Sequence, residues 1–428
     1  MRVCVAGLWH LGVVTAACVA AAGHRVVAYD DDASVVEGLR NGVLPVDEPG
    51  LAELVQQGLA AETLVLTNSM EEALEGADLV WIAYDTPVDE EDRADVAFVL
   101  ERARALVAAA GPDAVILISS QLPVGTTRLL EAPGRTVAYS PENLRLGAAI
   151  AAFTEPERIV VGIRADGDRA RIEELLGAFS DRIEWMGVES AELVKHGVNA
   201  FLALSVTFAN ELAGIAERVG ADAAEVERGL KTERRIGARA YLRPGGAFAG
   251  GTLARDVEYL TQIGEREGVG TQLLGAVRAS NEEHKRWAAR KIASLLGDED
   301  DRLDGKLIGV WGLVYKQGTD TLRRSSSVEL CRDLAGAGAV VKVHDSAIRR
   351  VPDDLSGLFA LCTSPLEAAE DASAVVVQTD WPSYREVEPE RLVAAMRSAL
   401  VVDPHGFLAK TLGKADGIRY VRVGGSAA

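Results

Sequence analysis

Apolar and polar residues along the first thirty positions follow the order of a strand, a glycine turn, a helix and a second strand. The pattern predicts a strand over residues 2–6, a turn over 7–12 and a helix over 13–22. A second apolar run at residues 24–29 ends on Asp30. This order is typical of a βαβ unit that binds a dinucleotide.

Further apolar runs of strand length alternate with stretches of helical periodicity. They lie at residues 79–83, 114–118, 136–139 and 158–163. Because strands that alternate with helices form parallel sheets, the pattern favours one parallel, doubly wound sheet up to about residue 185.

The pattern changes to long helices between residue 190 and about residue 297. Apolar and small residues recur there at helical spacing: Val194, Val198, Phe201, Leu202, Ser205, Phe208 and Leu212. A charged run at 298–304 follows, and strand-like runs then return at 306–314, 339–343, 374–378 and 399–402. We therefore predict an α/β protein in which two Rossmann-like doubly wound domains, residues 1–187 and 305–428, are joined by a central helical domain, residues 188–297.

Composition and charge narrow the possible partners. Of the 428 residues, 48% are hydrophobic and only 5% aromatic, which suits an α/β enzyme. The formal charge of −19 argues against an extended surface for nucleic acid or an anionic membrane, since phosphate binding needs clustered Lys and Arg. No uninterrupted apolar run reaches the ~18 residues of a membrane span, and residues 1–7 enter a strand with no cleavable signal. We expect a cytoplasmic protein with no nucleic-acid or membrane partner.

The four cysteines are far apart in the sequence. They have neither C-x-x-C spacing nor histidine partners: Cys4, Cys18, Cys331 and Cys362. We expect buried thiols, with no disulfide framework and no metal site.

The glycine turn keeps two of the three glycines of the G-x-G-x-x-G pattern. It reads Gly7-Leu8-Trp9-His10-Leu11-Gly12, so Trp9 stands where the middle glycine lets the backbone approach the pyrophosphate. Asp30 would accept hydrogen bonds from the ribose hydroxyls and repel a 2′-phosphate, which favours NAD over NADP. The alternative is that the glycines make only a tight turn, and that His10 is a solvated loop histidine.

A second motif lies at residues 248–256, which read Phe-Ala-Gly-Gly-Thr-Leu-Ala-Arg-Asp. The segment resembles the catalytic loop of the UDP-glucose/GDP-mannose dehydrogenase family, which reads roughly Phe-Gly-Gly-Ser-Cys-Leu-Pro-Lys-Asp. An alignment without gaps puts Thr252 at the cysteine, Ala254 at the proline and Arg255 at the lysine. Other segments are similar to family motifs in the same order along the chain: 140–147, 158–162, 195–211, 235–237, 241–245 and 316–325.

The resemblance implies a division of the chemistry between two oxidations of a sugar primary alcohol. For the first, it assigns Lys195 and Asn199 to stabilising negative charge on oxygen and Asp256 to holding a water that takes the hydroxyl proton. For the second, the family uses its cysteine as a nucleophile and a glutamate, here Glu142, in hydrolysis. Thr252 is a poor replacement, because its hydroxyl is almost fully protonated near neutral pH.

Two further departures concern the second oxidation. Gln121 stands where the family usually has threonine, and Leu146 stands where it often has glutamate. Other interpretations stay open for single residues. Asp256 could cap a helix that starts near Val257, and Thr252 could be a structural hydroxyl.

The resemblance also implies binding residues. For NAD these are the glycine-turn residues with Asp30, and also Thr86, Pro87, Gln121 and Arg323. For a UDP- or GDP-sugar they are Leu144, Arg145, Arg235, Tyr241, Arg243, Gly245, Phe248, Gly250 and Lys316, among which the guanidinium groups suit a diphosphate. Members of the family form dimers through the middle helices, so we expect a homodimer.

Three functions follow from these expectations. The leading hypothesis is an NAD-dependent oxidation of a nucleotide-sugar alcohol that stops after one two-electron step. The alternatives are a four-electron oxidation to a uronic acid without cysteine, through an aldehyde hydrate, and a silent homologue that binds nucleotide sugar without turnover.

Overall fold

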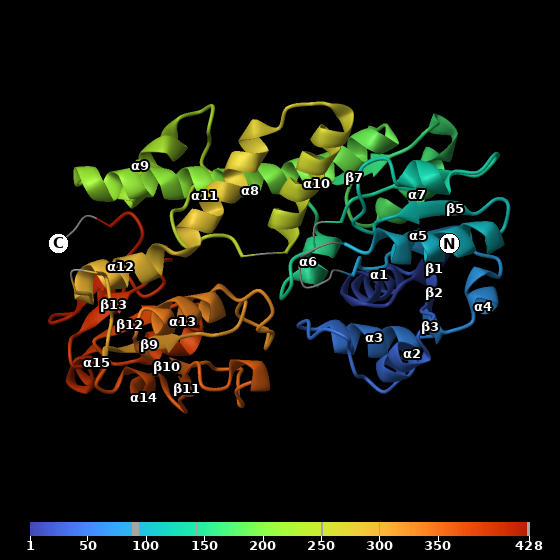
Figure 1. Ribbon diagram of the computed structural model, residues 1–428. Helices are drawn as coiled ribbons and strands as arrows, with labels where there is room; N and C mark the ends of the chain where they lie inside the picture. The colour runs from blue at the N-terminus through green and yellow to red at the C-terminus, as the bar shows by residue number, and fades with distance from the viewer. Residues whose placement is uncertain (88–93, 143, 250, 299, 426–428) are drawn as a thin grey trace. The chain divides into compact units, whose positions relative to one another are not determined.

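The computed structural model describes the chain except for residues 88–93, 143, 250, 299 and 426–428. The chain divides into two compact units, Met1–Val198 and Asn199–Ala428. Each unit contains one sheet with helices packed on both faces (Figure 1). Helix α8 (Val188–Val219) begins in the first unit and ends in the second. The expected α/β class, with Rossmann-like sheets and a helical middle part, is confirmed; the boundaries expected for three domains remain a prediction.

The sheet of the first unit has eight strands in the order β3-β2-β1-β4-β5-β6-β7-β8. The strands are β1 (Arg2–Ala6), β2 (Arg25–Tyr29), β3 (Leu64–Thr67), β4 (Leu79–Ile82), β5 (Val115–Ile118), β6 (Val137–Tyr139), β7 (Ile159–Gly162) and β8 (Ile183–Met186). One feature differs from the prediction, because β6 and β7 pair antiparallel. The connection between them holds only the six-residue helix α6 (Ala149–Thr154), which packs against α1 rather than carrying a full parallel crossover.

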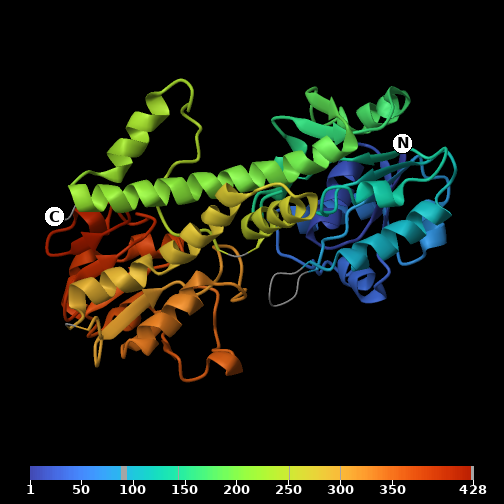
Figure 2. The same ribbon diagram turned by 45° about the horizontal axis from the view of Figure 1, so that its top comes forward.

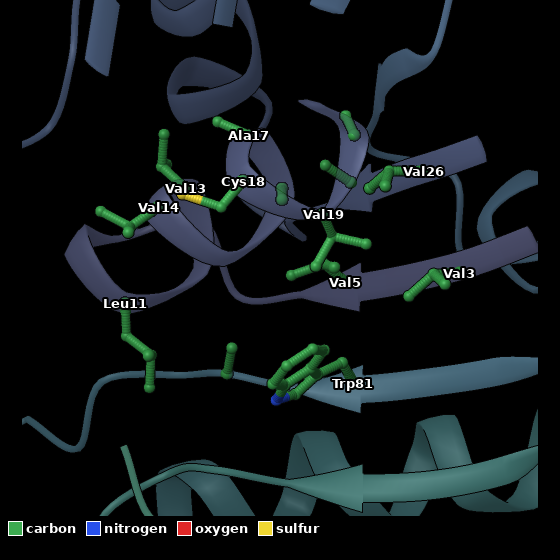
Figure 3. Packing of buried hydrophobic residues seen from close by; sticks show 14 of the residues in the cluster. Val3, Val5, Leu11, Val13, Val14, Ala17, Cys18, Val19, Val26 and Trp81 are labelled. Atoms are coloured by element: carbon green, nitrogen blue, oxygen red, sulfur yellow. The ribbon is translucent and has the colours of Figure 1, made fainter. Parts of the chain in front are cut away.

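Helices cover both faces of this sheet. They are α1 (His10–Ala21), α2 (Ala33–Arg40), α3 (Leu51–Ala60), α4 (Met70–Leu74), α5 (Val96–Ala109), α6 and α7 (Arg169–Leu176). One core joins α1, α2, α3 and α7 to alternate strand residues, and Figure 3 shows the α1 side chains beside Val3, Val5 and Val26. The other core joins α4, α5 and the start of α8 to the opposite face. Helix α1 begins at His10, earlier than the predicted residue 13, with Trp9 as its N-cap.

The second unit has a six-stranded sheet in the order β11-β10-β9-β12-β13-β14, and all its strand pairs are parallel. The strands are β9 (Leu307–Trp311), β10 (Val340–His344), β11 (Ala360–Leu361), β12 (Ala374–Val377), β13 (Leu400–Val402) and β14 (Arg419–Val421). The α-helices that follow α8 are α9 (Ala223–Thr232), α10 (Thr252–Glu267), α11 (Gln272–Lys285), α12 (Trp287–Leu296), α13 (Ser326–Gly336), α14 (Pro365–Ala369) and α15 (Pro389–Ala395). Helices α12 and α13 pack on one face of the sheet, and α14 and α15 on the other. The yellow to orange helices α10, α11 and α12 follow one another along the chain (Figure 2).

Helix α8 has the length and apolarity that a membrane span would need, and 44% of its apolar window is buried. Core helices of globular proteins share these properties, so they decide nothing about membranes. All four cysteines are buried free thiols, as the sequence predicted.

One buried carboxylate, Glu48, ties separate loops of the first unit together. It is 3% exposed and accepts backbone hydrogen bonds from Gly147 and Ala149, both at 2.8 Å. It also contacts His10 Nε2 at 3.0 Å, so His10 is not the solvated loop histidine that the sequence allowed. Burial alone would raise the pKa of Glu48, but these donors together hold it below the usual value of 4.5.

We predict that Glu48→Gln lowers stability by about 1–3 kcal/mol, because its amide N–H₂ would face donors that need an acceptor. A carboxyl whose folded pKa is lowered contributes stability above its unfolded pKa, and the contribution is lost as pH falls through the folded value. The difference in Tm between wild type and variant should therefore be full above pH 4.5 and shrink below it. The exposed Glu101→Gln is the control, and equal Tm values for wild type and Glu48→Gln at pH 7 would contradict the prediction.

Candidate functional site

The glycine turn after β1 has the backbone that a dinucleotide site requires. Gly7 has φ +92°, and a Cβ there would lie 2.6 Å from the Tyr84 ring. A Cβ on Gly12 would lie 1.6 Å from the Gly7 carbonyl oxygen. Neither position therefore accepts a side chain.

Asp30 holds this turn in place. Its carboxylate accepts a hydrogen bond from the Leu8 N–H at 2.6 Å and another from the Asp32 N–H at 3.0 Å. Burial raises the pKa of Asp30, while the two backbone donors oppose the rise. Asp30 thus orders the turn through these two hydrogen bonds. It also directly follows β2, at the position where the sequence predicts that it contacts the ribose.

The first turn of α1 offers backbone amides to an anion. Its N-cap Trp9 makes no side-chain cap, and the first turn contains no acidic residue. The Trp9 side chain is 49% exposed, so it does not fill the turn. These features fit a pyrophosphate at a helix N-terminus. However, Asp85 accepts a hydrogen bond from the Leu11 N–H at 3.3 Å and so brings a negative charge to the same amides.

The segment at residues 119–127 carries Gln121 and is anchored to neighbouring elements. Thr86 donates to the Gln121 carbonyl at 2.6 Å. Glu192 of α8, only 1% exposed, accepts from Gly125 and Thr127 N–H groups at 2.6 and 2.9 Å. Of the predicted cofactor residues, Thr86 is buried and Pro87 is exposed beside it. No local sequence pattern indicates the role of Glu192.

Lys195 and Glu142 lie together in the first unit. Lys195 is 5% exposed, and its ammonium donates to the Glu142 carbonyl oxygen at 2.5 Å, with Glu142 Oε1 at 3.4 Å. Glu142 Oε2 accepts from the Leu144 N–H at 2.5 Å. Arg145 is exposed, and Leu146 is half-buried. Lys195 is therefore a buried lysine and not a solvated one.

Asn199 and Asp256 form a second pair, in the second unit. The Asn199 amide donates to Asp256 Oδ2, and Asp256 is fully buried. Helix α10 begins at Thr252 with Gly251 as its N-cap. Asp256 is therefore the fifth residue of the helix and not a cap at its start, as the sequence had left open. Thr252 is exposed at the first helical position.

The predicted substrate residues of the second unit lie in three segments. Arg235 is exposed and pairs with Glu233 at 3.0 Å. Tyr241 is 59% exposed, and Arg243 donates to the His405 carbonyl at 2.8 Å. Gly245 and Phe248 lie two and five residues after Arg243, and Gly250 lies outside the described residues. Lys316 and Arg323 are exposed on the connection between β9 and α13.

No described cysteine offers a reactive thiol. Burial raises the pKa of Cys4, Cys18 and Cys331 to about 12 and also raises that of Cys362. Within the described parts of the chain, no group of three or more His, Cys, Asp or Glu side chains could hold a metal ion.

Comparison with known proteins matches nearly the whole chain. Residues 1–180, 189–283 and 309–410 match the NAD binding, central and UDP binding domains of the UDP-glucose/GDP-mannose dehydrogenase family. The chain belongs to the UDP-glucose/GDP-mannose dehydrogenase family. It is an NAD-dependent oxidoreductase of the class that acts on CH–OH groups, and its match to the family's UDP binding domain is consistent with a nucleotide-sugar substrate.

Relatives and solved structures agree with this membership. The chain is 33% identical to a UDP-glucose 6-dehydrogenase of Pseudomonas aeruginosa, over 94% of this chain and 93% of the relative. It is 32% identical to UDP-glucose 6-dehydrogenase TuaD of Bacillus subtilis, over 99% of this chain and 93% of the relative. Among structures, a UDP-glucose dehydrogenase from Pyrobaculum islandicum has a TM-score of 0.85 at 32% identity, covering 100% of this chain and 97% of the other. A UDP-D-ManNAc dehydrogenase from Pyrococcus horikoshii has the same TM-score at 25% identity, with full coverage of both chains.

We predict that Asp85→Asn binds NAD more tightly, because it removes a negative charge from amides that would face the pyrophosphate. A charge at a helix N-terminus is worth about 0.3–1 kcal/mol, so KM for NAD should fall roughly two- to fivefold. Titration with NAD measures the affinity, and Asp113→Asn on an exposed loop is the control. A rise in KM for NAD would mean that Asp85 assists binding instead.

Proposed function

We propose that this protein oxidises the primary alcohol of a UDP- or GDP-sugar by a single two-electron step that yields an aldehyde. The observation that carries the proposal is that both polar pairs, Lys195 with Glu142 and Asn199 with Asp256, are present in a chain that has Thr252 at the expected nucleophile position.

The first oxidation needs groups that take a proton and stabilise charge on oxygen. Asp256 would hold the water that accepts the hydroxyl proton, while Lys195 and Asn199 would donate hydrogen bonds to the developing negative oxygen. NAD, when bound, accepts a hydride from the carbon that carries this hydroxyl group. Each of the three side chains is at least nine-tenths buried, which strengthens such interactions.

The second oxidation in the family requires a thiolate that adds to the aldehyde. Thr252 is exposed at the start of α10, and a threonine hydroxyl is almost fully protonated near neutral pH. All four cysteines are buried, and the pKa of each thiol is raised. Without a nucleophile there is no covalent intermediate for Glu142 to hydrolyse.

A silent homologue is the second candidate, and two observations favour it. Trp9 replaces the middle glycine of the cofactor turn, and Asp85 places a carboxylate at the N-terminus of α1. A silent protein would be stabilised by nucleotide sugar without producing NADH.

We predict one NADH per sugar and a carbonyl product when the purified protein is incubated with NAD and a panel of UDP- and GDP-sugars. Product mass should show the loss of two hydrogens. Two NADH per sugar with a carboxylate product would refute the single-step proposal and support oxidation through an aldehyde hydrate. Ligand-dependent stabilisation without NADH would support the silent homologue.

We predict that Thr252→Cys gains a second oxidation, because the first position of α10 favours a thiolate. The expected result is a rise from one NADH toward two per sugar and the appearance of carboxylate. Thr252→Ser, which keeps a hydroxyl, is the matched control and should leave the product unchanged. If Thr252→Cys also leaves it unchanged, the nucleophile was not what limited the reaction.

We predict that Lys195→Met lowers kcat by about 10²–10⁴, the range expected when a proton-transfer or charge-stabilising group is lost. Steady-state kinetics with a saturating nucleotide sugar measure the effect, and KM for NAD should stay close to wild type. A change in stability alone, with kcat preserved, would show that the lysine is structural.

We also propose a homodimer, supported by large apolar side chains exposed along α8 in the second unit: Phe201, Phe208, Ile215 and Val219. The cytoplasmic location stays a prediction.

A further inference from the structure

The segment at residues 243–248 belongs to no helix or strand, yet side chains from other parts of the second unit hold its backbone. Asn210 of α8 is 3% exposed. Its side-chain oxygen accepts from the Gly245 N–H at 2.9 Å, and its N–H₂ donates to the Gly246 carbonyl at 3.3 Å. The Asn210 side chain therefore makes the backbone hydrogen bonds of two residues of the segment that a neighbouring strand would otherwise make.

A second buried asparagine repeats this arrangement at the end of the segment. Asn281 of α11 is also 3% exposed. It accepts from the Phe248 N–H at 3.0 Å and donates to the Phe248 carbonyl at 2.8 Å. The Phe248 side chain packs into a small apolar cluster with Ala203 and Val277.

Two histidines contact the glycines between these anchors. His284 Nε2 lies 2.8 Å from the Gly245 carbonyl and so carries the proton that it donates. His405 Nδ1 accepts from the Gly246 N–H at 3.3 Å. A Cβ on Gly246 would lie 2.7 Å from the His405 ring, so the ring packs directly against the glycine. The backbone carbonyl of His405 also accepts from the Arg243 guanidinium.

The held segment precedes α10, the helix that carries Thr252 and Asp256. Only three residues separate Phe248 from Thr252, where α10 begins, and Asp256 lies one turn further on. A displaced segment would therefore move the predicted diphosphate contacts at Arg243 and Gly245. Through Phe248 it would also disturb the start of α10.

We propose that Asn210, Asn281 and His405 are positioning residues that hold the 243–248 segment in the conformation that binds the nucleotide-sugar diphosphate. They act on the segment and not on the substrate. The inference rests on the proposed function for the identity of the ligand, but binding without turnover is enough to test it.

The sharpest variant is Asn281→Asp, which keeps the shape and the accepting oxygen of the side chain. Its second oxygen would face the Phe248 carbonyl, where Asn281 now donates at 2.8 Å. Loss of a buried hydrogen bond that leaves an acceptor unpaired predicts about a tenfold or larger loss of affinity. The matched control is Asn68→Asp, at an exposed position after β3.

A pair of variants at His405 separates positioning from packing. His405→Asn keeps an oxygen near the place of Nδ1 and should still accept from Gly246, whereas His405→Leu keeps bulk and removes the acceptor. Both retain the backbone carbonyl that orients Arg243. We expect His405→Asn to stay within about threefold of the wild-type affinity and His405→Leu to lose about tenfold.

The experiment measures binding of UDP-glucose and GDP-mannose to the full-length proteins by calorimetry, with Tm and KM for NAD as further readouts. Support requires weaker nucleotide-sugar binding in Asn281→Asp and His405→Leu, with KM for NAD unchanged and rescue in His405→Asn. Wild-type affinity in Asn281→Asp and His405→Leu, or equal losses in both His405 variants, would overturn the inference. A wild type that binds a nucleotide sugar but makes no NADH would defeat the proposed function and leave the positioning role standing. A wild type that binds neither probe would overturn both.

Discussion

Buried acceptors that satisfy loop backbone hold this structure in its functional form. Residues at the ends of strands leave N–H groups that no neighbouring strand pairs, and burying such a group without a partner is costly. Asp30 meets this need for the cofactor turn, Glu192 for the loop after β5, and Asn210 with Asn281 for the segment before α10. The loops that carry the candidate site are therefore fixed by side chains that do no chemistry themselves.

A glycine turn held by an aspartate also occurs after β9 in the second unit. Leu313 follows Gly312 after β9, and its N–H donates to the Asp345 carboxylate at 2.6 Å. The hydrogen bond from the Leu8 N–H to Asp30 in the first unit has the same length. Gly312 has φ +97°, close to the +92° of Gly7. The two turns differ in what comes next, because α13 begins only at Ser326, whereas α1 begins at His10. The second turn thus presents no helix N-terminus, and the longer connection carries Lys316 and Arg323 instead.

Most of the fold could be predicted from apolar runs, because central strands are buried on both faces. The strands that were missed are short or lie at sheet edges: β3, β8, β11 and β14. Lys195, Asn199 and Asp256 were proposed as site residues because they match family motifs. Glu48, Asp85, Glu192 and His405 were not, since their importance arises from contacts with distant residues. His405 and Gly246 are 159 residues apart, and no local pattern indicates that they touch.

Under the proposed single oxidation, the position of Thr252 explains how one substitution would change the chemistry without disturbing the fold. It is the first residue of α10, a helix with no side-chain cap and no acidic residue in its first turn. Such a helix end lowers the pKa of a cysteine enough to form a thiolate near neutral pH. A hydroxyl starts from a pKa so much higher that the same field leaves it protonated. The scaffold around residue 252 therefore still suits a nucleophile, and the side chain alone withholds it. By contrast, the roles proposed for Lys195, Asn199 and Asp256 require them only to donate, to accept or to hold water, and all three side chains are buried and hydrogen-bonded.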